Sequence, residues 1–186
     1  MSSIIKVDNI QEKTSANGVD IDSFKIKDGG ILAATGVPLQ VVTYADNITT
    51  GNVITSTSYV DIEQSSGTKL EIKITPKQSD SKILLISSVQ TYHEYAGHVA
   101  QLRALRDISG GTSDTVVGQY RFRDEDTPNN YNTNYPIPYN FVDTPNTTSE
   151  VTYHFQALVT NSSAELMWPA AGNGYHQVFT LWEIGV

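Results

Sequence analysis

The chain has 186 residues, 39% of them hydrophobic, and its 20 acidic and 12 basic residues give a formal net charge of −8. This length predicts one main domain, and so acidic a surface repels phosphate backbones, which excludes general nucleic-acid binding. The absence of cysteine excludes a disulfide scaffold, a thiolate zinc site and a cysteine nucleophile. No apolar run approaches the roughly 18 residues of a membrane span, and no secretory signal opens the chain, so we expect a soluble protein without membrane insertion.

Residues 1–40 are predicted to form an extended arm with two or three very short strands. Apolar and polar residues alternate in two short runs, and the alternation changes parity at Ser23, which indicates a bulge or turn. So small an arm cannot bury its own apolar side chains. We therefore expect it to attach the chain to a partner or to intertwine subunits, the alternative being a frayed terminus. The residues predicted to make this attachment are Ile4, Ile5, Val7, Ile10, Val19, Ile21, Phe24 and Ile26.

The stretch from Lys69 to Val89 carries the clearest strand patterns. Residues 70–74 alternate between apolar and charged side chains, which predicts a strand with one wet face. Pro76 cannot donate a backbone hydrogen bond and is expected at a strand end. Residues 83–86 are continuously apolar, which predicts a strand buried on both faces. Two further strands are predicted upstream, within residues 41–62.

Residues 99–122 are predicted to form a hairpin around the glycine-rich turn at residues 109–114. We favour a strand over a helix at residues 99–106, because Ala100, Leu102, Ala104 and the stem of Arg106 would then line one face. Residues 151–159 alternate clearly, and a last strand is predicted over residues 175–184. Trp168 and Trp182 lie in strand-like runs and are expected in the core.

About eight strands separated by turns predict an all-β fold, an antiparallel β-sandwich or jelly roll over residues 41–186. Threonine, serine, valine, isoleucine and tyrosine are prominent in the chain, which agrees with this fold class. The sheet edges of such a domain need cover, which packing against other subunits would supply.

Residues 123–150 contain four prolines and six asparagines, which argues against regular structure. Tyrosine rings offer flat apolar faces and asparagine adds donors and acceptors, the combination that sugar binding requires. The alternatives are that the tyrosines pack against a neighbouring subunit or cap the core, or that the loop is mobile. The candidate contacts with a glycan or other receptor are Tyr131, Tyr135, Tyr139, Asn132 and Asn134.

The sequence offers no clear catalytic or metal-binding motif. On a strand, His93 and His98 point to opposite faces, whereas His154 and His176 could meet across two strands. We interpret all four histidines as ordinary polar positions. Residues 124–126 are acidic but lack the spaced ligands of a calcium loop. Nucleophile, phosphate-loop and zinc-protease motifs are absent, and twenty acids supply too many chance carboxylate pairs to select one. We therefore expect no metal, no cofactor and no enzymatic activity.

Three segments carry a resemblance to a known group of proteins. The opening SSIIKVDNIQEKTSANGVDIDSFKIKDGGI, the central ITPKQSDSKILL and the closing LWEIGV resemble segments of small structural proteins of tailed phages, especially phages of marine bacteria. In those proteins a short leader precedes a β-rich domain. The resemblance implies a virion protein of tail-fibre, head-fibre or head-decoration type, assembled in the bacterial cytoplasm.

We accordingly predict a phage virion structural protein on the particle surface. Its arm would attach to capsid or tail proteins, and its sandwich would project outward and contact a host-surface glycan. The resemblance to phage fibres implies a homotrimer, whereas the residues themselves indicate only that the chain is not a monomer. The alternatives are a stand-alone carbohydrate-binding module and, less favoured because the chain is short, a capsule-degrading enzyme.

Overall fold

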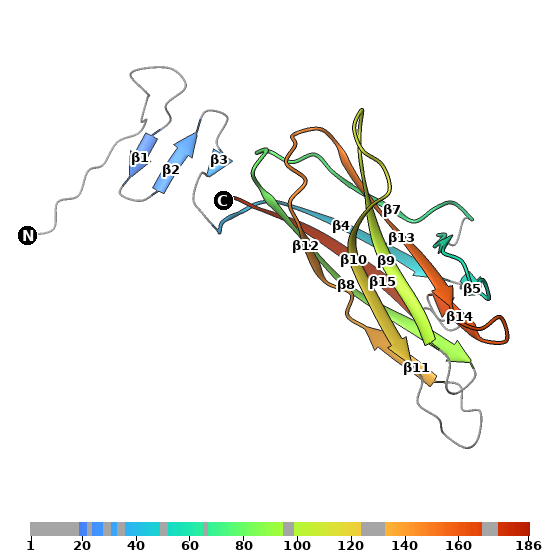
Figure 1. The fold of residues 1–186 in the computed structure, drawn as a ribbon. Helices are drawn as coiled ribbons and strands as arrows, with labels where there is room; N and C mark the ends of the chain where they lie inside the picture. Colours follow the sequence, from blue (N-terminus) through green and yellow to red (C-terminus); the bar gives the residue numbers. More distant parts are fainter. Residues whose placement is uncertain are drawn as a thin grey trace, which may run out of the picture.

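The computed structural model describes residues 19–21, 24–27, 31–32, 36–48, 52–64, 67–94, 99–123, 133–168 and 175–186. These residues form fifteen β-strands in three antiparallel sheets (Figure 1). None of them belongs to a helix that is long and apolar enough to cross a membrane. The predicted all-β fold class is confirmed.

A small sheet precedes the main body of strands. It consists of β1 (Val19–Ile21), β2 (Phe24–Lys27) and β3 (Ile31–Leu32), in that order. Val19 pairs with Ile26 and Ile21 pairs with Phe24, so short strands form on both sides of the predicted turn. Ile4, Ile5, Val7 and Ile10 lie outside the described residues, and the attachment role of the whole arm stays a prediction.

The first large sheet is centred on β13, and we call it the β13 sheet. Its order is β10-β9-β13, and the other edge of β13 pairs with β6 and β7. Because β9 and β13 pair over nine residues, they form its continuous centre. Its strands are β6 (Val60–Asp61), β7 (Glu71–Ile74), β9 (Val99–Ile108), β10 (Thr115–Arg123) and β13 (Val151–Val159).

The second large sheet contains the last strand of the chain, and we call it the β15 sheet. Its order is β4-β15-β8-β14-β5. β15 and β14 pair with successive parts of one edge of β8, and β12 and β11 pair with its opposite edge. Its strands are β4 (Pro38–Ile48), β5 (Asn52–Ile54), β8 (Lys82–Glu94), β11 (Thr133–Ile137), β12 (Phe141–Asp143), β14 (Glu165–Trp168) and β15 (Tyr175–Ile184).

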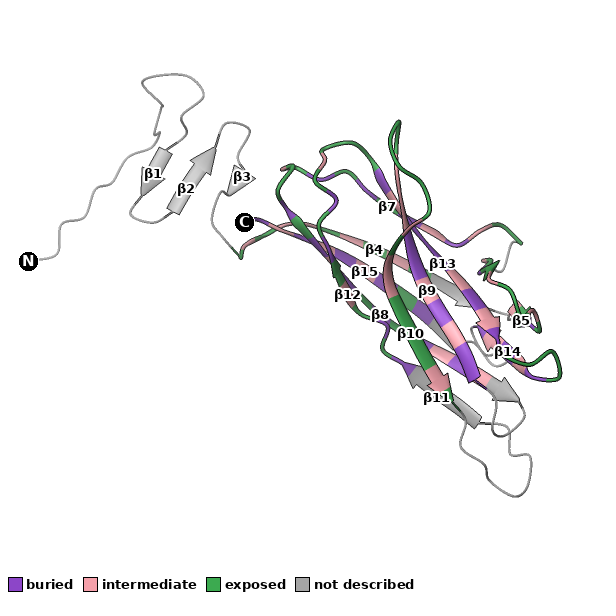
Figure 2. Ribbon diagram, in the orientation of Figure 1, coloured by how far each residue is buried: buried purple, intermediate pink, exposed green. Residues whose placement is uncertain are grey.

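The core lies between these two sheets. Buried residues alternate with more exposed ones along β9, β13 and β8, as an antiparallel sandwich with one covered face per sheet requires (Figure 2). Phe155 of the β13 sheet meets Phe179 of the β15 sheet at a ring-centroid distance of 4.9 Å, and Trp168 packs beside Phe155. The predicted inward set of β13 is confirmed: Val151, Tyr153, Phe155, Ala157 and Val159 are all buried.

The predicted hairpin is also confirmed. The antiparallel pair β9–β10 is closed by the turn at residues 109–114, and β9 is a strand throughout rather than a helix. Ala100, Leu102 and Ala104 face the core as expected. Trp168 is buried as predicted, whereas Trp182 is only partly buried on the outer face of β15, so its expected place in the core is wrong.

The stretch from Lys69 to Val89 gives one strand to each large sheet. β7 pairs with β13, and β8 pairs with β15, so the connection between them crosses from one sheet to the other, with Pro76 just past the end of β7. The prediction that residues 83–86 are buried on both faces is wrong. Ile83 and Leu85 face the core, but Ile86 is 42% exposed. The run is continuously apolar because the outer face of this sheet also carries apolar side chains.

The carboxylate of Glu183 holds this crossover against the last strand. Glu183 is fully buried on β15, and a buried carboxylate needs hydrogen-bond donors. One oxygen accepts from the backbone amides of Lys77 (2.7 Å) and Gln78 (3.1 Å) and from the Ser81 hydroxyl (2.7 Å). The other accepts from the side-chain amide of Gln40 at 2.6 Å.

A second buried carboxylate links the two sheets. Asp143 of β12 accepts hydrogen bonds from the Arg106 guanidinium at 2.7 Å and from the Tyr153 hydroxyl at 2.8 Å, and both partners belong to the β13 sheet. Burial raises the pKa of Tyr153, and the neighbouring Asp143 carboxylate raises it further. The sandwich is therefore tied internally by polar contacts as well as by its apolar core.

Candidate functional site

The tyrosine-rich segment is more ordered than its composition indicates, because it contains β11 and β12. Pro136 lies within β11, opposite Gln90 of β8. Among the described strands β11 pairs with β8 alone, and proline is tolerated on such an edge strand. The backbones of Asn134 and Tyr135 belong to this strand. Tyr131 and Asn132 lie outside the described residues, so their predicted part in glycan binding stays a prediction.

Tyr139 lies in the core. Its side chain is 3% exposed, and its hydroxyl accepts a hydrogen bond from the backbone amide of Ala104 at 2.9 Å. Its ring packs near those of Phe141 and Phe155, and burial raises its pKa. This placement matches the alternative in which the tyrosine caps the core. A ring so enclosed cannot stack on an external sugar, so we leave Tyr139 out of the glycan hypothesis.

The outer face of the β15 sheet carries a continuous row of apolar side chains. Trp182 pairs with Val41 on one side and with Leu84 on the other, and Leu84 pairs with Val142. Paired residues on neighbouring strands project to the same side of a sheet. Ile86 and Val178 extend this row along β8 and β15. We call the set the apolar face: Val41, Leu84, Ile86, Val142, Val178 and Trp182.

Much of the apolar face is open to solvent. Val142 is 58% exposed, Val41 48% and Val178 39%. Contiguous exposed apolar side chains on a soluble domain mark interaction surfaces more often than scattered ones do. The edge strand β4, which carries Val41, follows the predicted arm along the chain.

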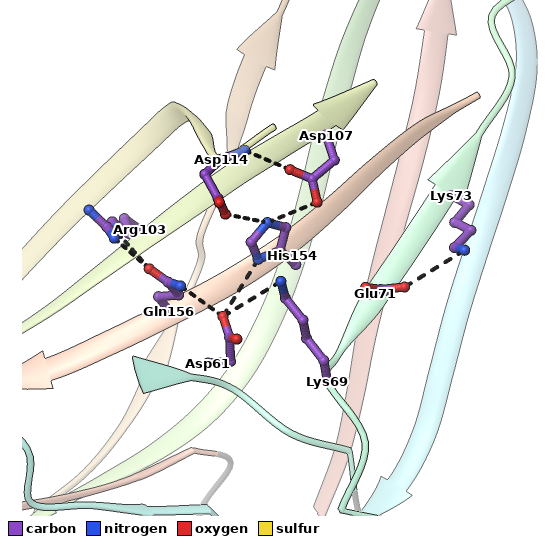
Figure 3. Close-up of polar contacts among 9 residues, drawn as sticks. All are labelled: Asp61, Lys69, Glu71, Lys73, Arg103, Asp107, Asp114, His154 and Gln156. Carbon is purple, nitrogen blue, oxygen red and sulfur yellow. Dashed lines mark hydrogen bonds and ion pairs between the residues drawn. The ribbon is translucent and has the colours of Figure 1, made fainter. Parts of the chain in front are cut away.

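The outer face of the β13 sheet is polar and internally bonded. The Arg103 guanidinium donates to the side-chain oxygen of Gln156, whose amide donates to Asp61 at 2.8 Å (Figure 3). Arg103 also lies over the ring of Tyr59, 3.9 Å from its centroid. These contacts connect β6, β9 and β13 across the sheet. The side chains of Arg103, Gln156 and Asp61 therefore bond to one another on this face.

One histidine lies inside this polar face. His154 is fully buried, and Asp61, Asp107 and Asp114 surround its ring (Figure 3). Among the residues that the structure describes, neither ring nitrogen has a hydrogen-bond partner. Leaving a buried polar group unsatisfied costs about 1–3 kcal/mol. We call these four residues the His154 cluster. Its Asp107, Asp114 and His154 could each offer one ligand atom to a cation.

An open groove lies between β4 and β7, where the two large sheets approach each other along one edge. It is lined by polar and apolar side chains together, including those of Tyr44, Gln64, Lys69, Glu71 and Lys73. Tyr44 contacts Phe179 at its back, with ring centroids 6.2 Å apart. A groove with one aromatic ring and several hydrogen-bonding groups suits a carbohydrate.

Sequence reasoning missed both outer-face features. The signal for the apolar face was present, because residues 83–86 are apolar at both parities, but the pattern was attributed to burial. The hairpin prediction brought Asp107 and Asp114 close together across the turn. Their approach to His154 depends on the pairing of β9 with β13, which strand patterns alone do not determine. His176 belongs to β15 in the other large sheet, so it is not a strand neighbour of His154.

The fold is an antiparallel β-sandwich, and comparison with solved structures finds viral proteins. One match is a structure of infectious bursal disease virus, Gx strain, with a TM-score of 0.39, 11% identity, and coverage of 86% of this chain and 40% of that chain. Another is the VP2 subviral particle of the same virus, with a TM-score of 0.37, 10% identity, and coverage of 85% and 45%. The chain thus spans less than half the length of each. No family model and no curated protein matches it.

Proposed function

We propose that the chain is a non-enzymatic structural protein of a phage virion and that it works as a homotrimer. Its arm would bind capsid or tail proteins, and its sandwich would project from the particle towards host-surface glycans. Two things support the proposal: the resemblance of three segments to tailed-phage structural proteins, and the all-β fold. The number three rests on the resemblance to fibres.

The observation that carries the assembly part is the apolar face. Trp182, Leu84 and Val142 form a row across three strands of one sheet, with neighbouring apolar side chains partly exposed. Burial of such a surface against another copy would contribute roughly 25 cal/mol for each Å² removed from water. A closed ring of identical copies would cover this face in every subunit.

Light scattering of the purified full-length protein tests assembly directly. We expect three times the subunit mass, and one subunit mass would overturn the trimer.

Ile86→Lys places a charge in the middle of the apolar face, so we expect it to yield folded monomers. Circular dichroism would show that the monomers keep their strands.

Truncation tests the arm. β4 begins at Pro38, and Gln40 bonds to Glu183, so a cut after residue 35 is safer than one after residue 40. Gly36 and Val37 also exchange backbone hydrogen bonds with Gly185. We expect the shortened protein to fold and to be absent from particles. Its incorporation into virions would place the anchor elsewhere.

The groove between β4 and β7 favours a second function, that of a carbohydrate-binding module outside any virion. Its expected signs are a stable monomer and saturable binding to a host polysaccharide. Glu71→Ala and Lys73→Ala, at two exposed or partly exposed positions lining the groove, should then weaken binding while leaving the fold intact. A glycan array with both variants would separate this function from assembly.

A further inference from the structure

His154 occupies an outward-facing position of β13 and yet has no exposed side-chain surface. Its neighbours Tyr153 and Phe155 face the core, so the imidazole ring projects to the opposite side of the sheet. Three carboxylates approach it there, beside its buried cross-strand partner Leu105. Within the described part of the chain, neither ring nitrogen forms a hydrogen bond. The ring is thus a buried potential metal ligand that only carboxylates approach at ion-pair distance.

Two carboxylates converge on the same ring nitrogen. Nε2 of His154 lies 3.3 Å from Oδ2 of Asp107 and 3.4 Å from Oδ1 of Asp114. A single N–H group can point at only one of them, and both distances exceed the roughly 2.7–3.2 Å of an ordinary hydrogen bond. A cation placed among the three atoms would contact all of them at once.

The spacing fits a tetrahedral metal site. Zinc binds imidazole nitrogen and carboxylate oxygen at about 2.0–2.2 Å, which puts tetrahedral ligand atoms about 3.4 Å apart. The three ligand atoms of the cluster all lie within 4.8 Å of one another. The two distances from the imidazole nitrogen, 3.3 and 3.4 Å, therefore match two edges of such a tetrahedron.

The surrounding groups hold the ligands as a metal site requires. Asp61 faces the other ring nitrogen of His154, with its Oδ1 3.7 Å from Nδ1, and Gln156 holds that carboxylate through a 2.8 Å hydrogen bond. The contact between Asp61 and Nδ1 is longer than a hydrogen bond, but a carboxylate on this side of the ring favours a proton on Nδ1, which leaves Nε2 free for metal. On the other side, the backbone amide of Asp114 donates to Oδ1 of Asp107 at 2.6 Å, which turns Oδ2 towards the imidazole.

We propose that Asp107, Asp114 and His154 bind a divalent first-row transition-metal ion of the zinc type, with Asp61 orienting the histidine. The imidazole ligand favours such an ion over calcium or magnesium, which prefer oxygen ligands alone. The ion would fasten the β9–β10 turn, which carries Asp114, to β13 at the centre of the sheet. Because the Asp114 side chain is 66% exposed, the fourth position faces solvent and is open to water. This proposal is independent of the virion assignment.

Metal titration of the full-length protein, first freed of metal with a chelator and held near neutral pH, tests the site. Calorimetry with zinc chloride should give one ion per chain, and the protein should unfold at a higher temperature when loaded. The imidazole ¹⁵N resonances of His154 should shift on loading, which separates this site from the other three histidines. Calcium and magnesium at the same concentration should leave these resonances in place.

Three matched substitutions locate the ion. Asp114→Asn removes a ligand while keeping a residue that tolerates the left-handed backbone found there (φ 53°), so we expect at least about 100-fold weaker binding. Asp61→Asn removes only the orienting carboxylate and should weaken binding about 10–100-fold. Asp80→Asn, at an exposed aspartate of the β7–β8 connection, should leave affinity unchanged.

Clear outcomes would overturn the proposal. Zinc affinity unchanged by Asp114→Asn, or loading that leaves the His154 resonances in place, would exclude this site. Absence of zinc binding would show that the contacts among these four side chains serve only the fold. Equal effects of calcium and zinc on His154 would contradict the zinc-type assignment. If Asp114→Asn fails to fold, Asp107→Asn tests the second carboxylate ligand in the same assay.

Discussion

The two outer faces of the sandwich solve different physical problems. On the β13 sheet, polar side chains such as Arg103, Gln156 and Asp61 bond to one another. On the β15 sheet, apolar side chains such as Val41, Trp182 and Val142 line up without polar groups between them. Most of the polar contacts of the first face form within one chain, whereas the second face would gain free energy by being covered.

This difference shows that strand composition alone does not reveal what a face is for. Both sheets alternate regularly on the side that meets the core, as their burial patterns show. They differ only on the side that the core does not constrain. Selection for folding acts on the inner set, so the outer set is where association or ligand binding can be encoded.

The contrast between the two faces requires that the two sheets stay joined. Asp143→Ala removes the carboxylate that links them, and we expect it to have the largest effect on stability. The substitution leaves the Arg106 guanidinium, only 14% exposed, without its carboxylate partner. We expect a loss of about 3–5 kcal/mol in unfolding free energy, measured by urea denaturation. The matched control is Glu71→Gln, which removes the exposed pair with Lys73 and should cost less than about 1 kcal/mol. If the two substitutions lowered the unfolding free energy equally, the contact of Asp143 with Arg106 would not stabilise the sandwich.

Alkaline pH should separate the sheets by a second route. The raised pKa values of Tyr153 and Tyr139 mean that the folded protein holds their protons more tightly than the unfolded chain does. This stabilisation is complete below pH 10 or so and is lost above it, at about 1.4 kcal/mol per pH unit for each tyrosine. Urea midpoints between pH 9 and pH 11.5 measure this slope.

Tyr153→Phe should reduce the alkaline slope, whereas Phe at the 41% exposed Tyr120 should not. An unchanged slope in Tyr153→Phe would show that other groups cause the alkaline loss.

Removing a polar contact from the outer face of the β13 sheet should lower the unfolding free energy by a smaller amount. Gln156→Ala removes the amide that links Arg103 to Asp61, so we expect a cost of about 1 kcal/mol in unfolding free energy. Denaturant titration measures the cost, and Gln119→Ala, which removes exposed contacts to Tyr59 and Gln101 on the same face, serves as the comparison. If both variants cost the same, the network on this face adds nothing beyond single exposed contacts.

The last prediction compares one exposed valine on each outer face, where a substitution should change stability least. Val142→Lys and Val116→Lys change valines that are 58% and 49% exposed, on the β15 and β13 sheets respectively. Each should alter unfolding free energy by no more than about 0.5 kcal/mol. Sedimentation velocity should then show weaker association for Val142→Lys alone. Equal behaviour of the two variants would remove the distinction between the faces.

Much of the fold could be predicted from local patterns. The alternation over residues 151–159 identified β13 and its inward face, and the glycine turn identified the β9–β10 hairpin. Prediction failed where an outer face is apolar, as at Ile86, and where a proline-rich segment pairs at a sheet edge, as in β11. In both cases tertiary context outweighs the local signal.

The candidate sites were harder to predict, because they depend on strand order. His154, Asp61 and Asp107 come from three different strands, and only the pairing of β13 with β6 and β9 unites them. Tyr139 shows the opposite error, since a composition typical of recognition surfaces placed a core residue among the candidate contacts. Burial, which sequence does not give directly, decides between these two roles.

The position of β15 has a consequence for the order in which the domain can be made. β15 pairs with both β4 and β8, so these strands have no neighbour on those edges until residues 175–184 have been synthesised. The same strand carries Glu183, which receives the backbone amides of the β7–β8 crossover. On the ribosome the β9–β10 hairpin can therefore pair early, whereas the two large sheets are completed only when β13 and then β15 have been made. Such late closure leaves long strand edges exposed during translation and gives chaperones a defined interval in which to protect them.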